Sequence, residues 1–225
     1  MVPEIMNMRT AFAVSIAALL AAATVVTGAE QMRLTSDTLQ YDPSRGAVVA
    51  SGNVKVVGRG AEITSDEGEF DSQGTRSWFR KSVLALWPGG DLSMNCDELV
   101  VEDGPRGQKI TARRVTRFHD PVRNVTMRAD VVEGTVAGGV FTDYVARGNV
   151  VADAVASGGE PTRVSGQRLR YSKSRGTLEL SGEATAIQKD RRITADTLIF
   201  YLQSGKIEAV GNPRMVVDLP PQEAQ

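Results

Sequence analysis

A short motif recurs six times along this 225-residue chain, and it constrains the fold more than any other feature. Each copy has an apolar, a polar and a small residue followed by an acid, which Gln replaces once. The copies end at Asp37, Asp66, Asp97, Asp130, Gln167 and Asp196. Their spacing of 29 to 37 residues predicts a stack of similar supersecondary units.

Each repeat contains two β-like halves. Apolar residues stand two and four positions after the acid, as Leu39 and Tyr41 do after Asp37. Fifteen residues after the acid, several copies have Gly followed by Asn or Glu, as in Gly52-Asn53, with apolar residues alternating on both sides. Alternation with a period of two is typical of a strand with one buried face. Because nothing after the N-terminal segment has sustained helical periodicity, we predict an all-β fold.

The spacing of apolar residues around each acid predicts a bend. Leu34 precedes Asp37 by three residues and Leu39 follows it by two, so these side chains are an odd number of positions apart. In an unbroken strand they would point to opposite faces. We therefore expect a bulge or bend in every repeat and two facing sheets, as in a jelly roll or a flattened β-solenoid of roughly 12–16 antiparallel strands.

The N-terminus has the pattern of an export signal. Arg9 precedes an uncharged stretch from Thr10 to Ala29, which ends in the small residues Thr27-Gly28-Ala29. We predict a cleaved signal peptide over residues 1–29, a β domain over 30–218 and a disordered tail over 219–225. A retained membrane anchor is the alternative, although the stretch is short and weakly apolar for a bilayer span. Cys96 is the single cysteine, so no intramolecular disulfide can form.

The repeat resembles the units of the OstA-like (LptA) family. The resemblance rests on Leu34 to Asp42 followed by Ala50 to Val56, and on Ile193 to Phe200 followed by Gly211-Asn212. It extends from Leu34 to about Asp218. It implies an open β-jellyroll with an apolar interior groove. It also implies that the protein is located in the periplasm and binds lipopolysaccharide without a cofactor. It also implies partners, namely related β-jellyroll domains of inner- and outer-membrane transport components, joined with this chain into a bridge.

The sequence leaves three alternatives open. A retained N-terminal anchor would favour a membrane-bound LptC-like component of the same system. A structural β-solenoid that polymerises without a ligand would have similar apolar faces. An enzyme acting on envelope glycans would need a convergent pair of acids, and no such pair can be identified in the sequence.

Equivalent positions in the repeats predict which apolar side chains point into the groove. We expect the lipid-binding groove to be lined by Leu34, Val48, Val54, Val56, Ile63, Tyr144, Val150, Leu178, Leu180, Ile193, Ile207 and Met215. The pattern defines which side chains face inward better in the first and last two repeats than between Gly74 and Thr126, where the sequence departs most from the repeat.

Polar residues give little support for catalysis. The only histidine, His119, stands in a turn-like context, and Cys96 occupies the small position of its repeat, which predicts a packing role. The repeated Asp residues have neither the spacing of a calcium loop nor a histidine for a transition-metal site, so we predict no metal site and no enzyme activity. We expect each Asp to accept backbone N–H groups at its bend.

Basic residues cluster in one segment, although the formal net charge of the chain is −1. The candidate contacts to a lipid headgroup are Arg113, Arg114, Arg117 and Arg123. Guanidinium groups suit phosphates and sugar acids. A solvated face is the alternative. Nucleic acid is not expected as a partner, because aromatic residues do not alternate with these charges.

The ends of the stack predict assembly. An open jellyroll leaves unpaired strand edges, which we place near Leu34 to Tyr41 and near Ile207 to Val217. Pairing of these edges would give a head-to-tail homo-oligomer.

Overall fold

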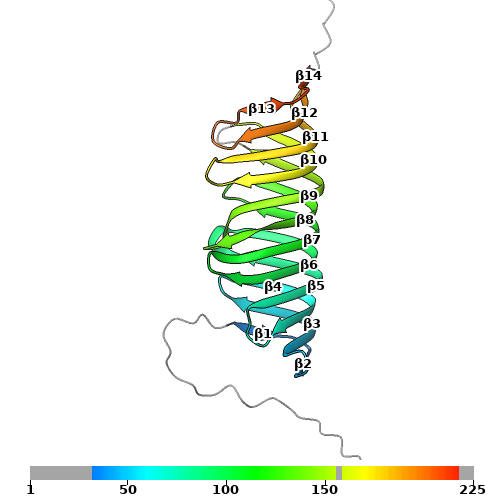
Figure 1. Ribbon diagram of the computed structural model, residues 1–225, viewed down its shortest axis with the longest axis vertical. Coiled ribbons are helices and arrows are strands. Elements are labelled where there is room, and N and C mark those ends of the chain that lie inside the picture. The colour runs from blue at the N-terminus through cyan, green and yellow to red at the C-terminus, as the bar shows by residue number, and fades with distance from the viewer. Residues whose placement is uncertain (1–31, 156–158, 218–225) are drawn as a thin grey trace, which may run out of the picture. The chain divides into compact units, whose positions relative to one another are not determined.

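The computed structural model describes residues 32–155 and 159–217, and the described chain is almost entirely antiparallel β-structure (Figure 1). This confirms the all-β fold class. The first seven strands are β1 (Arg33–Thr35), β2 (Thr38–Asp42), β3 (Ala47–Gly58), β4 (Ala61–Asp71), β5 (Arg76–Trp87), β6 (Leu92–Gly104) and β7 (Gly107–Asp120). The other seven are β8 (Val125–Ala137), β9 (Val140–Val155), β10 (Pro161–Ser172), β11 (Thr177–Gln188), β12 (Arg191–Tyr201), β13 (Ile207–Val210) and β14 (Arg214–Val217). The 3-10 turn η1 (Pro88–Gly90) joins β5 to β6.

Two predicted segments lie outside the described residues: the signal peptide over residues 1–29 and the tail over residues 219–225. Within the described ranges, no helix combines the length and apolar character that a bilayer span requires.

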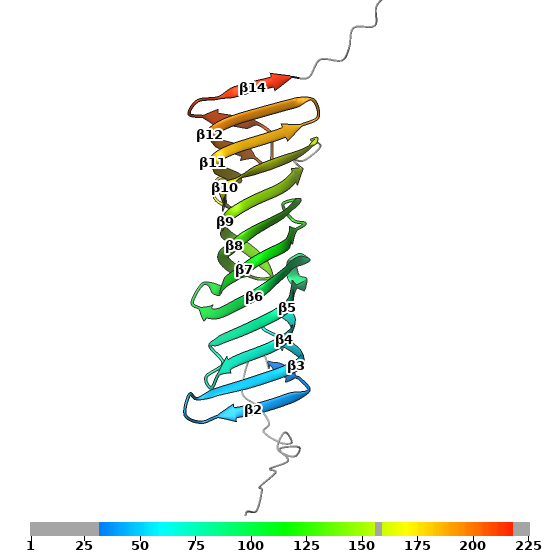
Figure 2. The same ribbon diagram turned by 90° about the vertical axis from the view of Figure 1, so that its right-hand side faces the viewer.

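The fourteen described strands belong to one antiparallel sheet, in which β3 to β12 pair in the order of the sequence. At one end β1 and β2 both pair with β3, and at the other end β13 and β14 both pair with β12. Each of these pairs is therefore one bent edge strand interrupted at its bend. Figure 2 shows β2 and β14 at opposite ends of the stack.

A bend in the middle of each long strand folds this sheet into two facing halves. In β3, Gly52 and Asn53 both have positive φ, of 72° and 48°, and together they lie opposite the single residue Asp66 of β4. Two residues opposite one is the signature of a β-bulge. The predicted bend is confirmed by the burial pattern of β4. Buried side chains fall on every second residue up to Ser65 and resume at Gly68, so the residues that face the interior change from odd to even numbers across the bend.

The acids and the left-handed residues alternate across the strands in a row that we call the bend line. It contains the six motif residues and, on the intervening strands, Gly52-Asn53, Lys81-Ser82, Arg114, Gly148-Asn149, Gly182-Glu183 and Gly211-Asn212, all left-handed. The middle repeats therefore keep the bend although they lack its glycine. The chemistry differs from the expectation in one respect: the carboxylates accept hydrogen bonds from side chains of the next strand rather than from backbone N–H groups.

Five such bonds run along the bend line. The carboxylate Oδ2 of Asp37 accepts from Asn53 Nδ2 at 2.9 Å, and the same contact joins Asn149 to Asp130 at 2.9 Å and Asn212 to Asp196 at 3.1 Å. Where Asn is missing, other donors serve: Ser82 Oγ is 3.0 Å from Asp66 and Arg114 Nε is 2.5 Å from Asp97. In five of the six described repeats, such a bond thus ties the two strand-forming halves of the repeat together at the bend.

The core fills the space between the two halves of the sheet. Its largest fully buried side chains include Trp87, Phe79, Phe118, Phe141 and Tyr144. The buried residues form one continuous apolar cluster from Ala50 in β3 to Phe200 in β12. A single core through ten strands explains how a chain without disulfides holds such an extended stack together.

Candidate functional site

The interior face collects all twelve residues predicted to line the groove. Seven are buried: Val54, Val56, Ile63, Tyr144, Val150, Leu178 and Leu180. Leu34, Val48, Ile193 and Ile207 are half-buried and pack against the same core. Met215 is 57% exposed, but it is the register partner of Ile193, so its side chain lies on the interior side of the edge strand β14. Contact of these residues with a lipid stays a prediction.

The interior is packed rather than hollow. Of the cavities on the interior side, one of about 30 Å³ lies next to Val56, Ile63 and Phe79, and one of about 10 Å³ lies between Leu169, Leu180 and Leu198. A volume of about 30 Å³ corresponds to a single water molecule. An acyl chain could enter only if the two halves of the sheet moved apart.

The halves meet where the hairpin turns lie, and we call this border the turn edge. Because the strands are antiparallel, the turns form two sets, one on each half. One set contains Gly58 to Gly60, η1 and Pro121 to Asn124. The other set contains Ser72 to Gly74, Gly138-Gly139 and Lys173 to Gly176. Parting the two halves at this edge would expose the interior without breaking the strand ladder.

Among the described residues, polar and backbone contacts cross the turn edge at three places. Near β3, Arg59 donates to the carbonyl of Gly74 at 2.7 Å and forms an ion pair with Asp103. At η1, the backbone of Gly89 lies so close to Gly139 that a Cβ on Gly139 would be 2.7 Å from Gly89 Cα. Sequence reasoning missed these residues, although the glycine pairs Gly89-Gly90 and Gly138-Gly139 signalled close backbone approach.

The third contact is made by Arg123. Its guanidinium donates to Asp120 Oδ2 and to the carbonyl oxygen of Phe141, both at 2.6 Å, and lies 4.3 Å from the ring of Tyr171. Burial by itself would lower the pKa of Arg123, but hydrogen bonding to Tyr171 and Asp120 outweighs it and raises the pKa. The side chain is only 8% exposed. Arg123 therefore lies apart from the other predicted headgroup contacts and faces inward.

The remaining candidate arginines lie on the outer surface. Arg114 is on the bend line, Arg113 is beside it and lies 3.8 Å from Glu98, and Arg117 is exposed on β7. The bend line runs through the middle of the strands, whereas the turn edge lies at their ends. Contact of Arg113, Arg114 and Arg117 with a headgroup stays a prediction, and it would require the headgroup to reach the bend.

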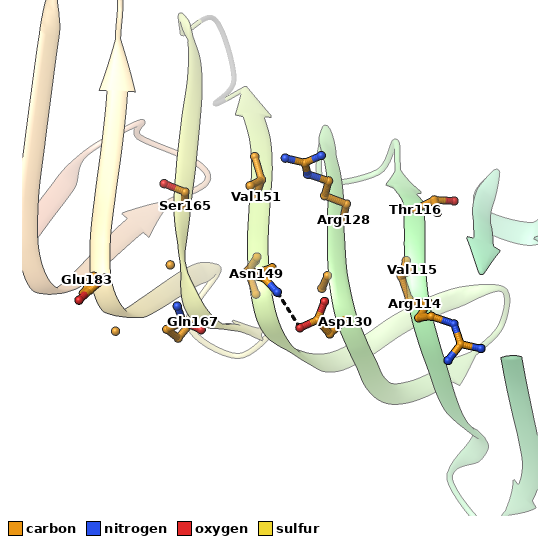
Figure 3. Close-up of a pocket in the computed structure, with 14 residues that line it drawn as sticks. Arg114, Val115, Thr116, Arg128, Asp130, Asn149, Val151, Ser165, Gln167 and Glu183 are labelled. Carbon is orange, nitrogen blue, oxygen red and sulfur yellow. Dashed lines mark hydrogen bonds between the residues drawn. The ribbon is translucent and has the colours of Figure 1, made fainter. Parts of the chain in front are cut away.

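An open outer depression of about 730 Å³ lies along the same part of the bend line (Figure 3). Arg114, Asp130 and Asn149 line it at the level of the bends, and Figure 3 shows Gln167 and Glu183 continuing the row. Its charges are of both signs, and Arg114 is already paired with Asp97. This surface therefore lacks the uniform positive charge that would concentrate anions.

Cys96 and His119 both have structural contacts. Cys96 is buried, as its packing role predicts, and burial raises the pKa of its thiol to about 12, which disfavours the reactive thiolate. His119 lies within β7 rather than in a turn, and its Nδ1 is 2.9 Å from Thr126 Oγ1. Among residues 32–155 and 159–217, no group of three or more acids, histidines or cysteines is arranged to hold a metal ion.

Comparison with known proteins assigns the family. The family model for the LptA/(LptD N-terminal domain) LPS transport protein matches residues 33–206, while no curated protein matches the chain by sequence. Among solved structures, the chain is similar to LptH from Pseudomonas aeruginosa, the LptA homologous periplasmic component of the conserved lipopolysaccharide transport device. The identity is 11%, the match covers 84% of this chain and 96% of that one, and the TM-score is 0.34. Since the family model spans most of the sequence and its repeats, the chain belongs to the LptA/LptD N-terminal family of lipopolysaccharide-transport proteins.

Proposed function

We propose that this protein is a periplasmic carrier of lipopolysaccharide and forms part of a bridge from the inner to the outer membrane. The observation that supports this most is the continuous apolar interior, which runs from β3 to β12 and is closed along the turn edge by contacts between residues in and beside the turns. Acyl chains would lie between the two halves of the sheet, and the sugar headgroup would remain outside at the turn edge.

The hydrophobic effect is sufficient for such binding. Burial of one CH₂ group contributes roughly 0.8 kcal/mol, so a chain of about 12–14 carbons gains on the order of 10 kcal/mol. Part of this gain would offset the loss of core contacts when the halves separate. The protein would be a passive conduit, because its sequence has no phosphate-binding loop through which nucleotide hydrolysis could drive the movement.

Photo-crosslinking tests the proposed location of the lipid. A photoreactive residue at Val54 or at Leu180, both on the interior face, should capture lipopolysaccharide in cells that export the protein. The matched controls are an adjacent residue in each strand: Lys55, which follows Val54 and is exposed, and Glu179, which precedes Leu180 and points outward. Capture would be read from the lipid-linked shift on a denaturing gel. Equal capture at interior and exterior positions would contradict binding between the halves.

Mass spectrometry of lipids bound to the purified protein is the complementary measurement. Lipopolysaccharide should be recovered with the intact chain. A protein that folds, assembles and carries no lipid would instead support a ligand-free structural solenoid.

A further inference from the structure

Three buried hydrogen-bond donors at the turn edge have no acceptor. They are Trp87 Nε1, Arg123 Nε and Tyr144 Oη, and none has a hydrogen-bond partner among the residues that the structure describes. Trp87 is 1% exposed and Tyr144 is fully buried. Buried polar groups are nearly always paired, because removal from water without a new partner is unfavourable. Three exceptions in one region therefore call for an explanation.

The three side chains belong to one aromatic cluster. The ring of Trp87 is 6.3 Å from that of Phe141, which is 5.6 Å from Tyr144. Tyr144 stacks on Tyr171 at 5.1 Å, and Arg123 lies over Tyr171. Trp87 and Arg123 come from one half of the sheet and the tyrosines from the other. The cluster thus spans the turn edge where the halves would part.

The missing partner must be an acceptor. An indole N–H and a guanidinium N–H can only donate, and a phenol can donate as well as accept. The acceptors that the described residues place beside Arg123, namely the Asp120 carboxylate and the Phe141 carbonyl, already receive hydrogen bonds from its guanidinium. A ligand that satisfies the cluster therefore has to bring an oxygen with free lone pairs.

That oxygen should be uncharged. The positive charge of Arg123 is already balanced by Asp120, which is 1% exposed. An added anion would be buried without a counter-charge beside Phe118 and Phe141, which is strongly unfavourable. A neutral carbonyl oxygen carries no such penalty, and the aromatic walls suit an attached hydrocarbon chain.

We propose that Trp87, Arg123 and Tyr144 form a binding site for the carbonyl oxygen of an ester- or amide-linked acyl chain. This inference rests on the proposed function, because the acyl chain enters only when the turn edge opens. The site would fix how far each chain is inserted, with its carbonyl at the turn edge and its hydrocarbon in the core. This assignment replaces a phosphate contact as the role of Arg123.

The test compares two ligands that differ in one carbonyl: 1-dodecanoylglycerol, an ester, and its ether analogue 1-dodecylglycerol. Binding is followed by Trp87 fluorescence in the full chain with Trp78→Phe, which removes the other tryptophan, a half-exposed residue beneath Arg76. One or two neutral hydrogen bonds should make the ester bind about two- to tenfold more tightly than the ether. Tyr144→Phe should reduce this preference toward equal affinity for the two ligands.

Three controls separate the explanations. Tyr144→Phe should unfold at the same or a higher temperature, because it removes an unpaired hydroxyl; a marked loss of stability would show a structural partner and overturn the proposal. Equal affinity for ester and ether, absence of binding by both, or tighter binding of dodecanoate would also overturn it. Lipopolysaccharide binding measured on the same protein tests the proposed function separately, since its loss would refute the carrier role whatever the ester preference.

Discussion

At the residue scale, the bend line depends on a left-handed backbone under a carboxylate. Gly148 has φ of 73°, and a Cβ there would be 2.2 Å from Asp130 Oδ2 and 2.9 Å from its Cβ. Glycine is therefore required twice, once for the backbone conformation and once for the space. The bond that occupies this space, from Asn149 Nδ2 to Asp130, ties β9 to β8 at the bend.

Gly138 provides a matched control for this double requirement, because its φ is 59° and nothing lies within 4 Å of the position of its Cβ. Gly138→Ala should cost about 1–2 kcal/mol for the left-handed backbone. Gly148→Ala adds the clash and should cost roughly 3 kcal/mol or more in total. Chemical denaturation of both variants measures the difference. Equal costs would mean that Asp130 moves aside freely and that its contact contributes little.

At the element scale, β5 shows how a strand keeps the bend without glycine. Lys81 and Ser82 have φ of 62° and 50°, which is costly for such residues, yet Ser82 still donates to Asp66 and Lys81 lies 2.6 Å from Glu67. The register with β4 and β6 shifts here as it does at the other bends. Pairing with both neighbours therefore imposes the bend on a local sequence that does not favour it.

Restoring the repeat pattern in β5 should stabilise the protein. Asn tolerates the left-handed region better than Ser and can donate to Asp66 as Asn53 does to Asp37. Ser82→Asn should raise the free energy of unfolding by about 0.5 kcal/mol. Ser82→Ala loses the hydrogen bond with no conformational gain and should lower it. Urea unfolding of the two variants checks the order, and a loss of stability in Ser82→Asn would show that the serine geometry is specifically required.

At the scale of the whole β unit, the two ends remain unpaired in the chain described. Leu39 and Tyr41 on β2 are 60% and 55% exposed, and Met215 and Val216 on β14 are each 57% exposed. Apolar side chains on an open sheet edge favour pairing with another strand. The edges lie where the sequence predicts them, and Pro213 falls between β13 and β14, where it interrupts the ladder.

Head-to-tail pairing of these edges should give oligomers that grow with concentration. Deletion of Lys206 to Gln225 removes β13 and β14 and should leave a smaller species, whereas deletion of residues 218–225 keeps both strands and should preserve association. Sedimentation velocity over a wide concentration range distinguishes them. An intact protein that stays monomeric and also fails to bind a related β-jellyroll domain would refute the bridge. An intact protein that stays monomeric but binds such a domain would contradict only the predicted self-association.

The sequence by itself determined the all-β class, the repeat, the bend at each acid and the interior facing of residues such as Val54 and Leu180. These follow from local parity and glycine placement, because side-chain direction in a strand alternates with a period of two. The tertiary structure decided the rest. In the folded chain, Arg123 faces inward, apart from Arg113, Arg114 and Arg117. Gly89 packs against Gly139, and the side chains of Trp87 and Tyr144 are buried without hydrogen-bond acceptors among the described residues. Those outcomes depend on which turns meet across the two halves of the sheet, and such contacts join residues about 20 to 50 positions apart that no local pattern connects.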